Sequence, residues 1–244
     1  ILTGLVLFLL LFAWRRQDQM KKTALFYGLS LLWCIPYLLV TYSWTGKVFY
    51  WATSGGMSLY WMSSPYAGEL GSWFSDDDVQ ALPELAPHRE FFAGMADLSE
   101  VERDEILKKQ ALENIIRYPS RFLRNWIANV GRLLFSYPYS YTPQKISTYF
   151  YLLPNMFLVV FLVLSVYPAG LRARTIPYEI YGLLLFALIA TGGTSLLCAC
   201  DRQFRPQVPI FLLWMAFVYL RILRIEVRTP GIQHLPSENG LDSD

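Results

Sequence analysis

Long apolar runs recur along this chain with few charged residues inside them. Several of these runs hold about 20 residues, which is enough for a helix to cross the hydrocarbon core of a bilayer. Charged residues make up 16% of the chain, whereas soluble domains carry about a quarter. Because backbone groups in lipid must be hydrogen-bonded within the protein, helices are the expected form of such runs. The sequence therefore predicts an all-α integral membrane protein.

Five apolar segments are candidate membrane helices. They cover residues 1–14, 23–43, 148–168, 178–199 and 207–223. The first is shorter than a full span, and no basic stretch precedes it as in a signal peptide. We therefore expect the chain to begin inside a helix and to be part of a longer protein.

Three short connections between these segments are basic. They read RRQDQMKK, LRARTIP and RILRIEVR, and they fall on one side of the membrane if the segments alternate. The positive-inside rule assigns that side to the cytoplasm. We expect a bacterial inner membrane or plasma membrane protein with residues 44–147 outside the cytoplasm.

Four parts follow from this topology. Residues 1–43 hold the first two membrane helices, 44–147 an extracytoplasmic lobe, 148–223 the last three membrane helices, and 224–244 a polar cytoplasmic tail. The tail shows no periodicity and is expected to be disordered unless a partner orders it.

The start of the lobe is expected to be irregular. Residues 44–74 mix aromatic residues with glycine and serine, which favours packed loop, and SDDDVQALPELAP is typical of exposed loop. Asp76, Asp77 and Asp78 are interpreted as a solvated acidic turn, because a calcium site needs more oxygen ligands at regular spacing.

Two helices are predicted in the second half of the lobe. Ser99 and Glu102 form a capping-box signature at the start of the first, and Pro119 separates it from a second, amphipathic helix over residues 120–135. Its apolar stripe suits the plane of a membrane surface, or it packs on the neighbouring lobe. The predicted membrane-interface residues are Arg121, Arg124, Trp126 and Arg132.

Common catalytic and metal-binding patterns are missing from the sequence. It has no G-x-S-x-G, no phosphate-binding glycine loop and no H-E-x-x-H. The three cysteines have no zinc spacing, and His88 has no partner in view. We expect no metal and no cofactor, and a net charge of +2 gives no reason to expect nucleic acid as a partner.

The stretch DRQFRPQVPIF places Arg202 and Arg205 at the outer end of the last membrane segment. Proline is tolerated in the first helical turn, so Pro206 and Pro209 would hold the two arginines at the headgroup level. Guanidinium binds phosphate in a bidentate way. The arginines therefore suggest an anionic lipid headgroup as partner, with interfacial contact to ordinary phospholipid as the alternative.

Three stretches resemble integral membrane glycosyltransferases of the GT-C fold, the superfamily of protein mannosyltransferases and aminoarabinose transferases. SGGMSLYWMSSPYAG is similar to the family's G-x-N-L-Y-x-G-N-N-P-x-A loop. RYPSRFLRNWIANVGRLLF resembles its surface helix, and DRQFRPQVPIF its R-[FY]-R-x-P-x-x-P segment before a late membrane helix. The likeness covers most of residues 20–225 and corresponds to the family's C-terminal half.

The resemblance implies transfer of a sugar from a polyprenyl-phosphate donor outside the cytoplasm. It implies lipid-phosphate contact for Arg202 and Arg205, and a place at the sugar cavity for Tyr60, Ser63 and Ser64. The family's acidic base lies in a first external loop that this sequence lacks, so no catalytic residue is assigned. The alternative is a non-catalytic subunit, derived from this fold, of a respiratory or photosynthetic membrane complex.

Overall fold

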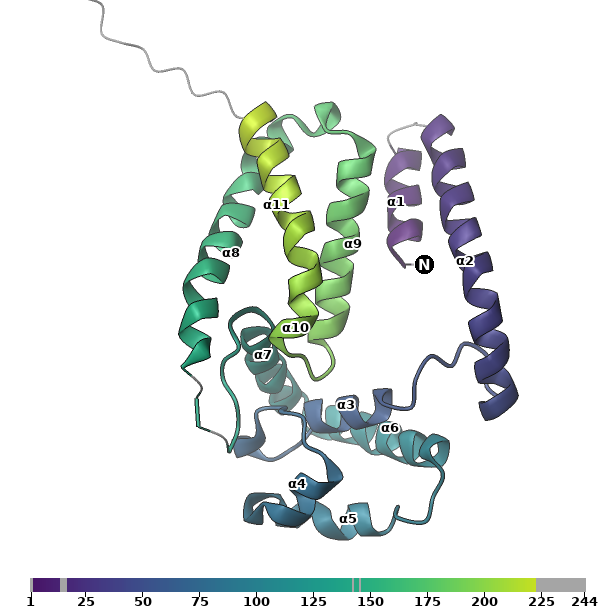
Figure 1. Cartoon of the computed structure of the whole chain (residues 1–244), viewed down its shortest axis with the longest axis vertical. Coiled ribbons are helices and arrows are strands. Elements are labelled where there is room, and N and C mark those ends of the chain that lie inside the picture. Colours follow the sequence, from purple (N-terminus) through teal and green to yellow (C-terminus); the bar gives the residue numbers. More distant parts are fainter. Residues whose placement is uncertain (1, 14–16, 142, 145, 223–244) are drawn as a thin grey trace, which may run out of the picture.

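The structure is a computed structural model that describes residues 2–13, 17–141, 143–144 and 146–222. These residues form helices and connecting turns, with no strand among them. Long helices run side by side in one layer, and a lobe of shorter helices lies at one end of that layer (Figure 1). The predicted all-α class is therefore confirmed, whereas the tail 224–244 lies outside the described residues.

Two helices are long and apolar enough to cross a membrane. They are α2, Gln17–Thr45, and α8, Ser147–Leu171. Only 6% of the most apolar stretch of α2 and 11% of that of α8 are buried in the protein. Their apolar side chains therefore face outward, as a helix surrounded by lipid requires.

The five predicted spans are supported only in part. Two of them, 23–43 and 148–168, fall in α2 and α8. The other three fall in α1 (Leu2–Ala13), α9 (Tyr178–Ser195) and α11 (Val208–Phe217). Helices α1 and α11 have 12 and 10 residues, short of the roughly 20 needed, although a π-helical stretch extends α11 to Ile222. Helix α9 has polar residues at both ends.

Helix α11 lies between α8 and α9 in the apolar layer and packs on both (Figure 1). Its Phe211 and Trp214 are buried in the layer's core. The Trp214 indole Nε1 donates a hydrogen bond to Ser165 Oγ of α8 at 2.8 Å. Packing and this buried hydrogen bond fix α11 against α8.

The lobe is more regular than the sequence predicts. It contains α3 (Gly55–Met62), α4 (Asp76–Ala81), α5 (Arg89–Ala93), α6 (Glu100–Arg117) and α7 (Pro119–Phe135). Helix α3 replaces part of the loop expected over 44–74, and α4 replaces the exposed loop expected at the three aspartates. Ser75 and Asp78 form a capping box that starts α4, so short-range capping explains this correction.

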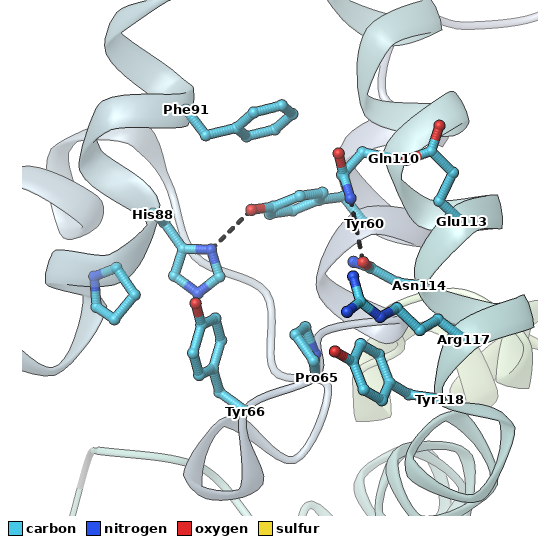
Figure 2. Close-up of a pocket in the computed structure, with 11 residues that line it drawn as sticks. Tyr60, Pro65, Tyr66, His88, Phe91, Gln110, Glu113, Asn114, Arg117 and Tyr118 are labelled. Atoms are coloured by element: carbon cyan, nitrogen blue, oxygen red, sulfur yellow. Dashed lines mark hydrogen bonds between the residues drawn. The ribbon is translucent and has the colours of Figure 1, made fainter.

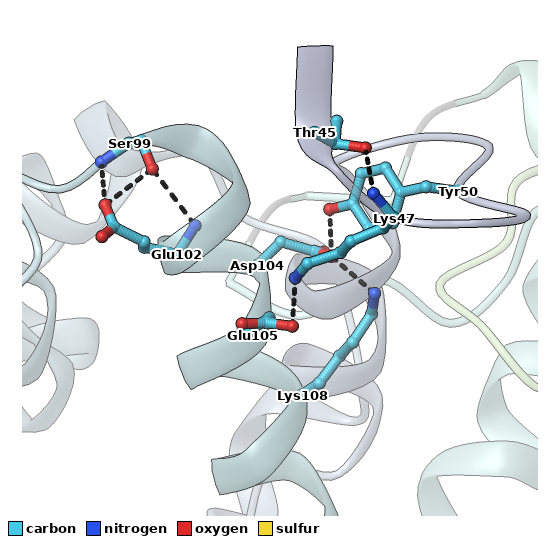
Figure 3. Close-up of polar contacts among 8 residues, drawn as sticks. All are labelled: Thr45, Lys47, Tyr50, Ser99, Glu102, Asp104, Glu105 and Lys108. Atoms are coloured by element: carbon cyan, nitrogen blue, oxygen red, sulfur yellow. Dashed lines mark hydrogen bonds and ion pairs between the residues drawn. The ribbon is translucent and has the colours of Figure 1, made fainter. Parts of the chain in front are cut away.

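Helices α6 and α7 follow the prediction closely. The Ser99 backbone nitrogen donates to Glu102 Oε2 at 3.0 Å, which confirms the capping box (Figure 3). Helix α6 ends before Pro119, and α7 restarts with that proline in its first turn. Proline cannot continue a helix but is tolerated at its first position, so the boundary was readable from the sequence.

The connection from α2 into the lobe is held against α6. Tyr50 Oη donates to Asp104 Oδ2 at 2.6 Å, and Lys47 pairs with Glu105 (Figure 3). Asp104 is fully buried and also accepts the Gly56 backbone N–H at 2.5 Å and the Lys108 ammonium at 2.5 Å. One carboxylate thus joins the connection, α3 and α6.

Candidate functional site

Helix α7 buries Asn125, Asn129 and Arg132 together with Leu133, and it exposes two large apolar side chains. Asn125 Nδ2 donates to the carbonyls of Met62 and Ser64 at 3.1 and 3.0 Å. By contrast, Leu123 is 52% exposed and Ile127 is 62% exposed. These two apolar side chains of α7 therefore lie on the surface of the protein.

Arg132 was predicted to lie at the membrane interface, but the structure places it in the interior of the lobe. Its side chain is 2% exposed and donates to the carbonyls of Gly71 at 2.8 Å and Pro138 at 3.1 Å. Buried carbonyls require donors, so this guanidinium serves the lobe interior. Burial lowers the pKa of Arg132 from its ordinary value, but the group stays charged because its pKa starts far above neutrality.

The other predicted interface residues lie nearer the surface. Arg124 is exposed, and Arg121 and Trp126 are half-buried. Trp126 Nε1 donates to Ser195 Oγ, at the end of α9, at 3.1 Å. This bond joins α7 to the apolar layer, so α7 lies where the lobe and the layer meet.

Arg202 and Arg205 lie on a short helical segment at that same junction (Figure 1). The sequence predicts a plain turn over 200–206, but α10 covers Asp201–Phe204 and a 3₁₀ turn covers Arg205–Gln207. Phe204 is 3% exposed and contacts Phe211 of α11, which anchors the segment. The buried Phe204 side chain therefore holds this polar segment against α11.

The two arginines differ in their surroundings. Arg205 forms an ion pair with Asp201, donates to Tyr151 Oη at 2.6 Å, and lies over the Tyr151 ring. Its side chain is still 57% exposed, and the bond to Asp201 raises its pKa. Arg202 is exposed and has no hydrogen-bond or ion-pair partner among the residues that the structure describes.

Tyr60 lies in the last turn of α3, Ser63 and Ser64 follow that helix, and all three are buried. Ser63 Oγ donates to the Tyr60 carbonyl at 3.0 Å, and Ser64 Oγ donates to Glu69. No hydrogen bond joins these residues to Arg202 or Arg205 within the described ranges. Tyr60 also lines a cavity of the lobe.

That cavity is bordered by a buried hydrogen-bonded chain centred on His88. His88 Nε2 lies 2.7 Å from Glu69 Oε1, and His88 Nδ1 lies 2.7 Å from Tyr60 Oη. His88 and Glu69 are 2% and 1% exposed. The expectation that His88 has no partner is therefore wrong, because η2 (Pro83–His88) places it beside residues distant in the sequence.

The direction of these hydrogen bonds follows from the chemistry of the partners. With the ring proton on Nε2, facing the Glu69 carboxylate, His88 donates to Glu69 and its Nδ1 accepts from the Tyr60 hydroxyl. Burial and the nearby Glu69 raise the pKa of Tyr60, so the phenol keeps its proton. Both ring nitrogens of His88 are therefore occupied by Glu69 and Tyr60.

The cavity itself has a volume of about 330 Å³ (Figure 2). One wall is the polar face of α6, and the opposite wall is formed by aromatic rings, prolines and His88. Its lining residues are Tyr60, Pro65, Tyr66, Pro87, His88, Phe91, Gln110, Glu113, Asn114, Arg117 and Tyr118. No group of three or more metal-ligating side chains occurs in the part of the chain that the structure describes.

A second, apolar groove of about 970 Å³ lies between α2 and α9. Phe26 and Leu31 of α2 face Leu183 and Phe186 of α9, and Lys22 lies near one end. Sequence reasoning did not predict either cavity. For the polar one, the available signal was a lone histidine in the aromatic-rich stretch PHREFF.

Comparison with known proteins gives no assignment: no family model, curated protein or solved structure matches this chain.

Proposed function

We propose that this chain is the C-terminal part of a membrane glycosyltransferase that uses a polyprenyl-phosphate-linked sugar, and that Arg202 and Arg205 bind the lipid phosphate. One observation carries the proposal. The arginine segment, which consists of α10 and the 3₁₀ turn Arg205–Gln207, lies at the junction between the apolar helices and the polar lobe (Figure 1). This junction is the level of phosphate headgroups if the helices span the bilayer.

The charges at this junction support binding of a phosphate. Arg205 is held in place by Asp201 and Tyr151 while its side chain remains 57% exposed. Arg202 supplies a second exposed cation three residues away. A preoriented guanidinium loses less side-chain entropy on binding, so Arg205 would position the phosphate and Arg202 would complete the charge neutralisation.

The five-span topology belongs to the same proposal. With α2 and α8 crossing the membrane, α1, α9 and α11 lie beside them in the same layer. The exposed Leu123 and Ile127 of α7 would then rest on the outer membrane surface. The basic connections would lie in the cytoplasm, with the lobe outside.

Lipid binding by the purified protein tests the proposal. Undecaprenyl phosphate is titrated into the detergent-solubilised protein, and bound lipid is counted by native mass spectrometry. The double variant Arg202→Ala/Arg205→Ala should bind at least tenfold more weakly, since each charge-assisted contact contributes about 1.5–3 kcal/mol. Lys21→Ala/Lys22→Ala removes the same charge at another basic site and should bind normally.

Phosphatidylglycerol serves as the competing lipid. If the arginines bind only ordinary headgroups, phosphatidylglycerol will bind as tightly as undecaprenyl phosphate and lose affinity equally in the double variant. That outcome, or unchanged undecaprenyl phosphate affinity in the double variant, would refute donor binding.

The second candidate is a non-catalytic subunit of a larger membrane complex, and the apolar groove between α2 and α9 favours it. A groove of this size in the membrane layer suits a helix of a neighbouring subunit. Purification in a mild detergent separates the candidates: stable co-purification of other membrane proteins without sugar transfer supports the subunit, and a lone, active protein excludes it.

A further inference from the structure

The apolar groove between α2 and α9 is a second possible binding site, which the arginine segment does not use. Its volume is about 970 Å³, at the upper end of the range for small-molecule sites, roughly 300–1,000 Å³. Leu31, Leu183 and Phe186 line the groove, and they are 41%, 41% and 48% exposed. These side chains are therefore available to an apolar ligand.

Helix α1 forms the base of the groove. It lies between α9 and α2 (Figure 1), and its Leu7 lines the groove while being only 5% exposed. Two glycines allow close packing of the three helices. A Cβ at Gly4 would lie 2.6 Å from the Tyr27 ring of α2, and a Cβ at Gly182 of α9 would lie 3.2 Å from Leu7 Cδ2. The groove is therefore built by helix packing and exists without a ligand.

The length of the groove matches one leaflet of a bilayer. On α2 it extends from Lys22 to Cys34, which is about 18 Å at 1.5 Å per residue. One leaflet supplies about 15 Å, half of the hydrocarbon core. At the far end lies Trp51, which stacks on Tyr37 of α2 with ring centroids 5.7 Å apart. An acyl chain that enters beside Lys22 would therefore reach about the middle of the layer.

The other end of the groove carries one cation and one anion. Lys22 and Glu179 both line it, and each lies near the start of its helix. Both helices start at the same end of the layer (Figure 1). Both side chains are exposed, and no ion pair joins them among the residues that the structure describes. The two charges can therefore meet a headgroup that carries both signs.

From these features we propose that the groove binds one molecule of phosphatidylethanolamine. Its phosphate would contact Lys22, its ammonium would contact Glu179, and an acyl chain would lie between α2 and α9. Both contacts are charge-assisted hydrogen bonds. Phosphatidylglycerol has no ammonium, so its phosphate would lie beside Glu179 without compensation for the like charge.

The site lies at the opposite end of the layer from the arginine segment (Figure 1). The basic connection LRARTIP precedes α9 at this end, so the positive-inside rule would place the lipid in the cytoplasmic leaflet. The inference rests on the membrane position of α2 and α9 that belongs to the proposed function. It does not rest on donor binding by Arg202 and Arg205.

A helix of a neighbouring subunit is the competing occupant of this groove. Such a helix would cross the whole hydrocarbon core, whereas the groove follows α2 for about one leaflet. An apolar helix would also make no use of the charges of Lys22 and Glu179. Both features favour a lipid.

Lipid titration of the full chain tests the inference. The protein is delipidated in detergent, and bound lipid is counted by native mass spectrometry. The probes are phosphatidylethanolamine, phosphatidylglycerol and phosphatidylcholine, all with palmitoyl and oleoyl chains. One phosphatidylethanolamine should bind per chain, about fivefold more tightly than phosphatidylglycerol. Phosphatidylcholine should also bind more weakly, because its quaternary ammonium has no proton to donate to Glu179.

Charge variants locate the headgroup. Lys22→Glu should weaken phosphatidylethanolamine about tenfold, whereas Lys21→Glu, next to it but outside the groove, should leave the affinity unchanged. The exchanged pair Lys22→Glu/Glu179→Lys should recover most of the loss, because a headgroup of both signs can turn around. Glu179→Gln should remove the preference over phosphatidylglycerol. Circular dichroism confirms that each variant remains folded.

Four outcomes would overturn the inference. They are no bound phosphatidylethanolamine, equal affinity for phosphatidylglycerol in wild type, equal losses in Lys22→Glu and Lys21→Glu, and a co-purified membrane protein whose removal is needed before lipid binds. The last outcome would assign the groove to a neighbouring helix.

Donor binding is measured separately in the same variants. Lys22→Glu should still bind undecaprenyl phosphate at the arginine segment, and Arg202→Ala/Arg205→Ala should still bind phosphatidylethanolamine. Loss of one ligand without the other therefore shows which of the two proposals has failed.

Discussion

The apolar layer and the lobe depart from a water-soluble protein in opposite ways. In the layer, large apolar side chains are exposed: Trp33 is 83% exposed and Phe150 is 76% exposed. In the lobe, charged side chains are buried: Glu69, Asp104 and Arg132 are each at most 2% exposed. The layer therefore carries its apolar side chains on its surface, whereas the lobe depends on specific internal hydrogen bonds.

Because of this difference, we expect mutations in the lobe interior and mutations on the surface of the layer to have different effects on folding stability. A side chain in the lobe interior has partners that no solvent molecule replaces, so its loss should be costly. An exposed apolar side chain of the layer has few protein contacts, so its loss should matter little to folding in detergent. The following predictions test that division.

Arg132→Ala should have the largest effect. The substitution leaves the Gly71 and Pro138 carbonyls without a charged donor and should lower the free energy of unfolding by about 3 kcal/mol. Urea unfolding in detergent, followed by circular dichroism, measures it. The exposed Arg124→Ala is the control and should change stability by less than about 0.5 kcal/mol; equal effects would contradict the burial of Arg132.

Gly56→Ala should be the next most costly. A Cβ at this position would lie 2.2 Å from the Asp104 carbonyl oxygen, so α3 and α6 would have to separate. Overpacking of this kind costs about 1–3 kcal/mol. Thermal unfolding provides the comparison with Gly55→Ala, whose Cβ would meet only Lys108 Cε at 3.7 Å. If both variants are equally stable, the close packing of α3 on α6 is wrong.

Tyr60→Phe should change how stability depends on alkaline pH. Burial and Glu69 raise the pKa of Tyr60, so in the folded state it keeps its proton above the unfolded value of about 10. The folded state then binds more protons, and its stability falls as pH rises through that value. Removing the hydroxyl should cost about 1 kcal/mol at neutral pH and reduce the alkaline slope.

The measurement is urea unfolding of wild type and Tyr60→Phe at pH values from 7 to about 11. Ser63→Ala is the control, because Ser63 Oγ donates to the Tyr60 backbone carbonyl and its loss removes no ionisable group, so the slope should not change. An unchanged slope in Tyr60→Phe would mean that the phenol ionises normally and is not held by His88.

Features that depend on neighbouring residues could be predicted from the sequence, whereas features that depend on contacts between distant residues could not. The Ser99–Glu102 capping box and the break at Pro119 are set by neighbouring residues, and both were predicted correctly. The His88–Glu69 contact joins residues 19 apart through turns with no periodic pattern. No propensity describes such a contact, so the polar cavity was missed.

The burial of Arg132 was missed for a related reason. Helical periodicity separates its apolar stripe from its polar face but does not say which face meets the lobe. Arg132 is held in the lobe by hydrogen bonds to the carbonyls of Gly71 and Pro138. The positions of these carbonyls depend on the tertiary fold. Asn125, Asn129 and Arg132 are therefore buried in spite of their polarity, whereas Arg124 remains exposed.

Ile127→Ser should have the smallest effect on folding. Ile127 is 62% exposed, so its replacement should change the free energy of unfolding in detergent by less than about 0.5 kcal/mol. Leu133→Ser, on the same helix but 1% exposed, is the contrast and should be clearly destabilised. A large loss in Ile127→Ser would show that this face packs on protein rather than on the membrane surface.

The central claim is that the arginine segment lies at the phosphate level between the apolar layer and the lobe. Its most direct test is the bilayer depth of a spin label at Arg202→Cys, measured by oxygen and nickel-chelate relaxation with Cys34, Cys198 and Cys200 replaced by serine. Labels at Phe161→Cys and Glu84→Cys mark the acyl chains and the water. We predict a depth between these two, close to the phosphates; a label at position 202 as water-accessible as that at 84 would contradict the claim.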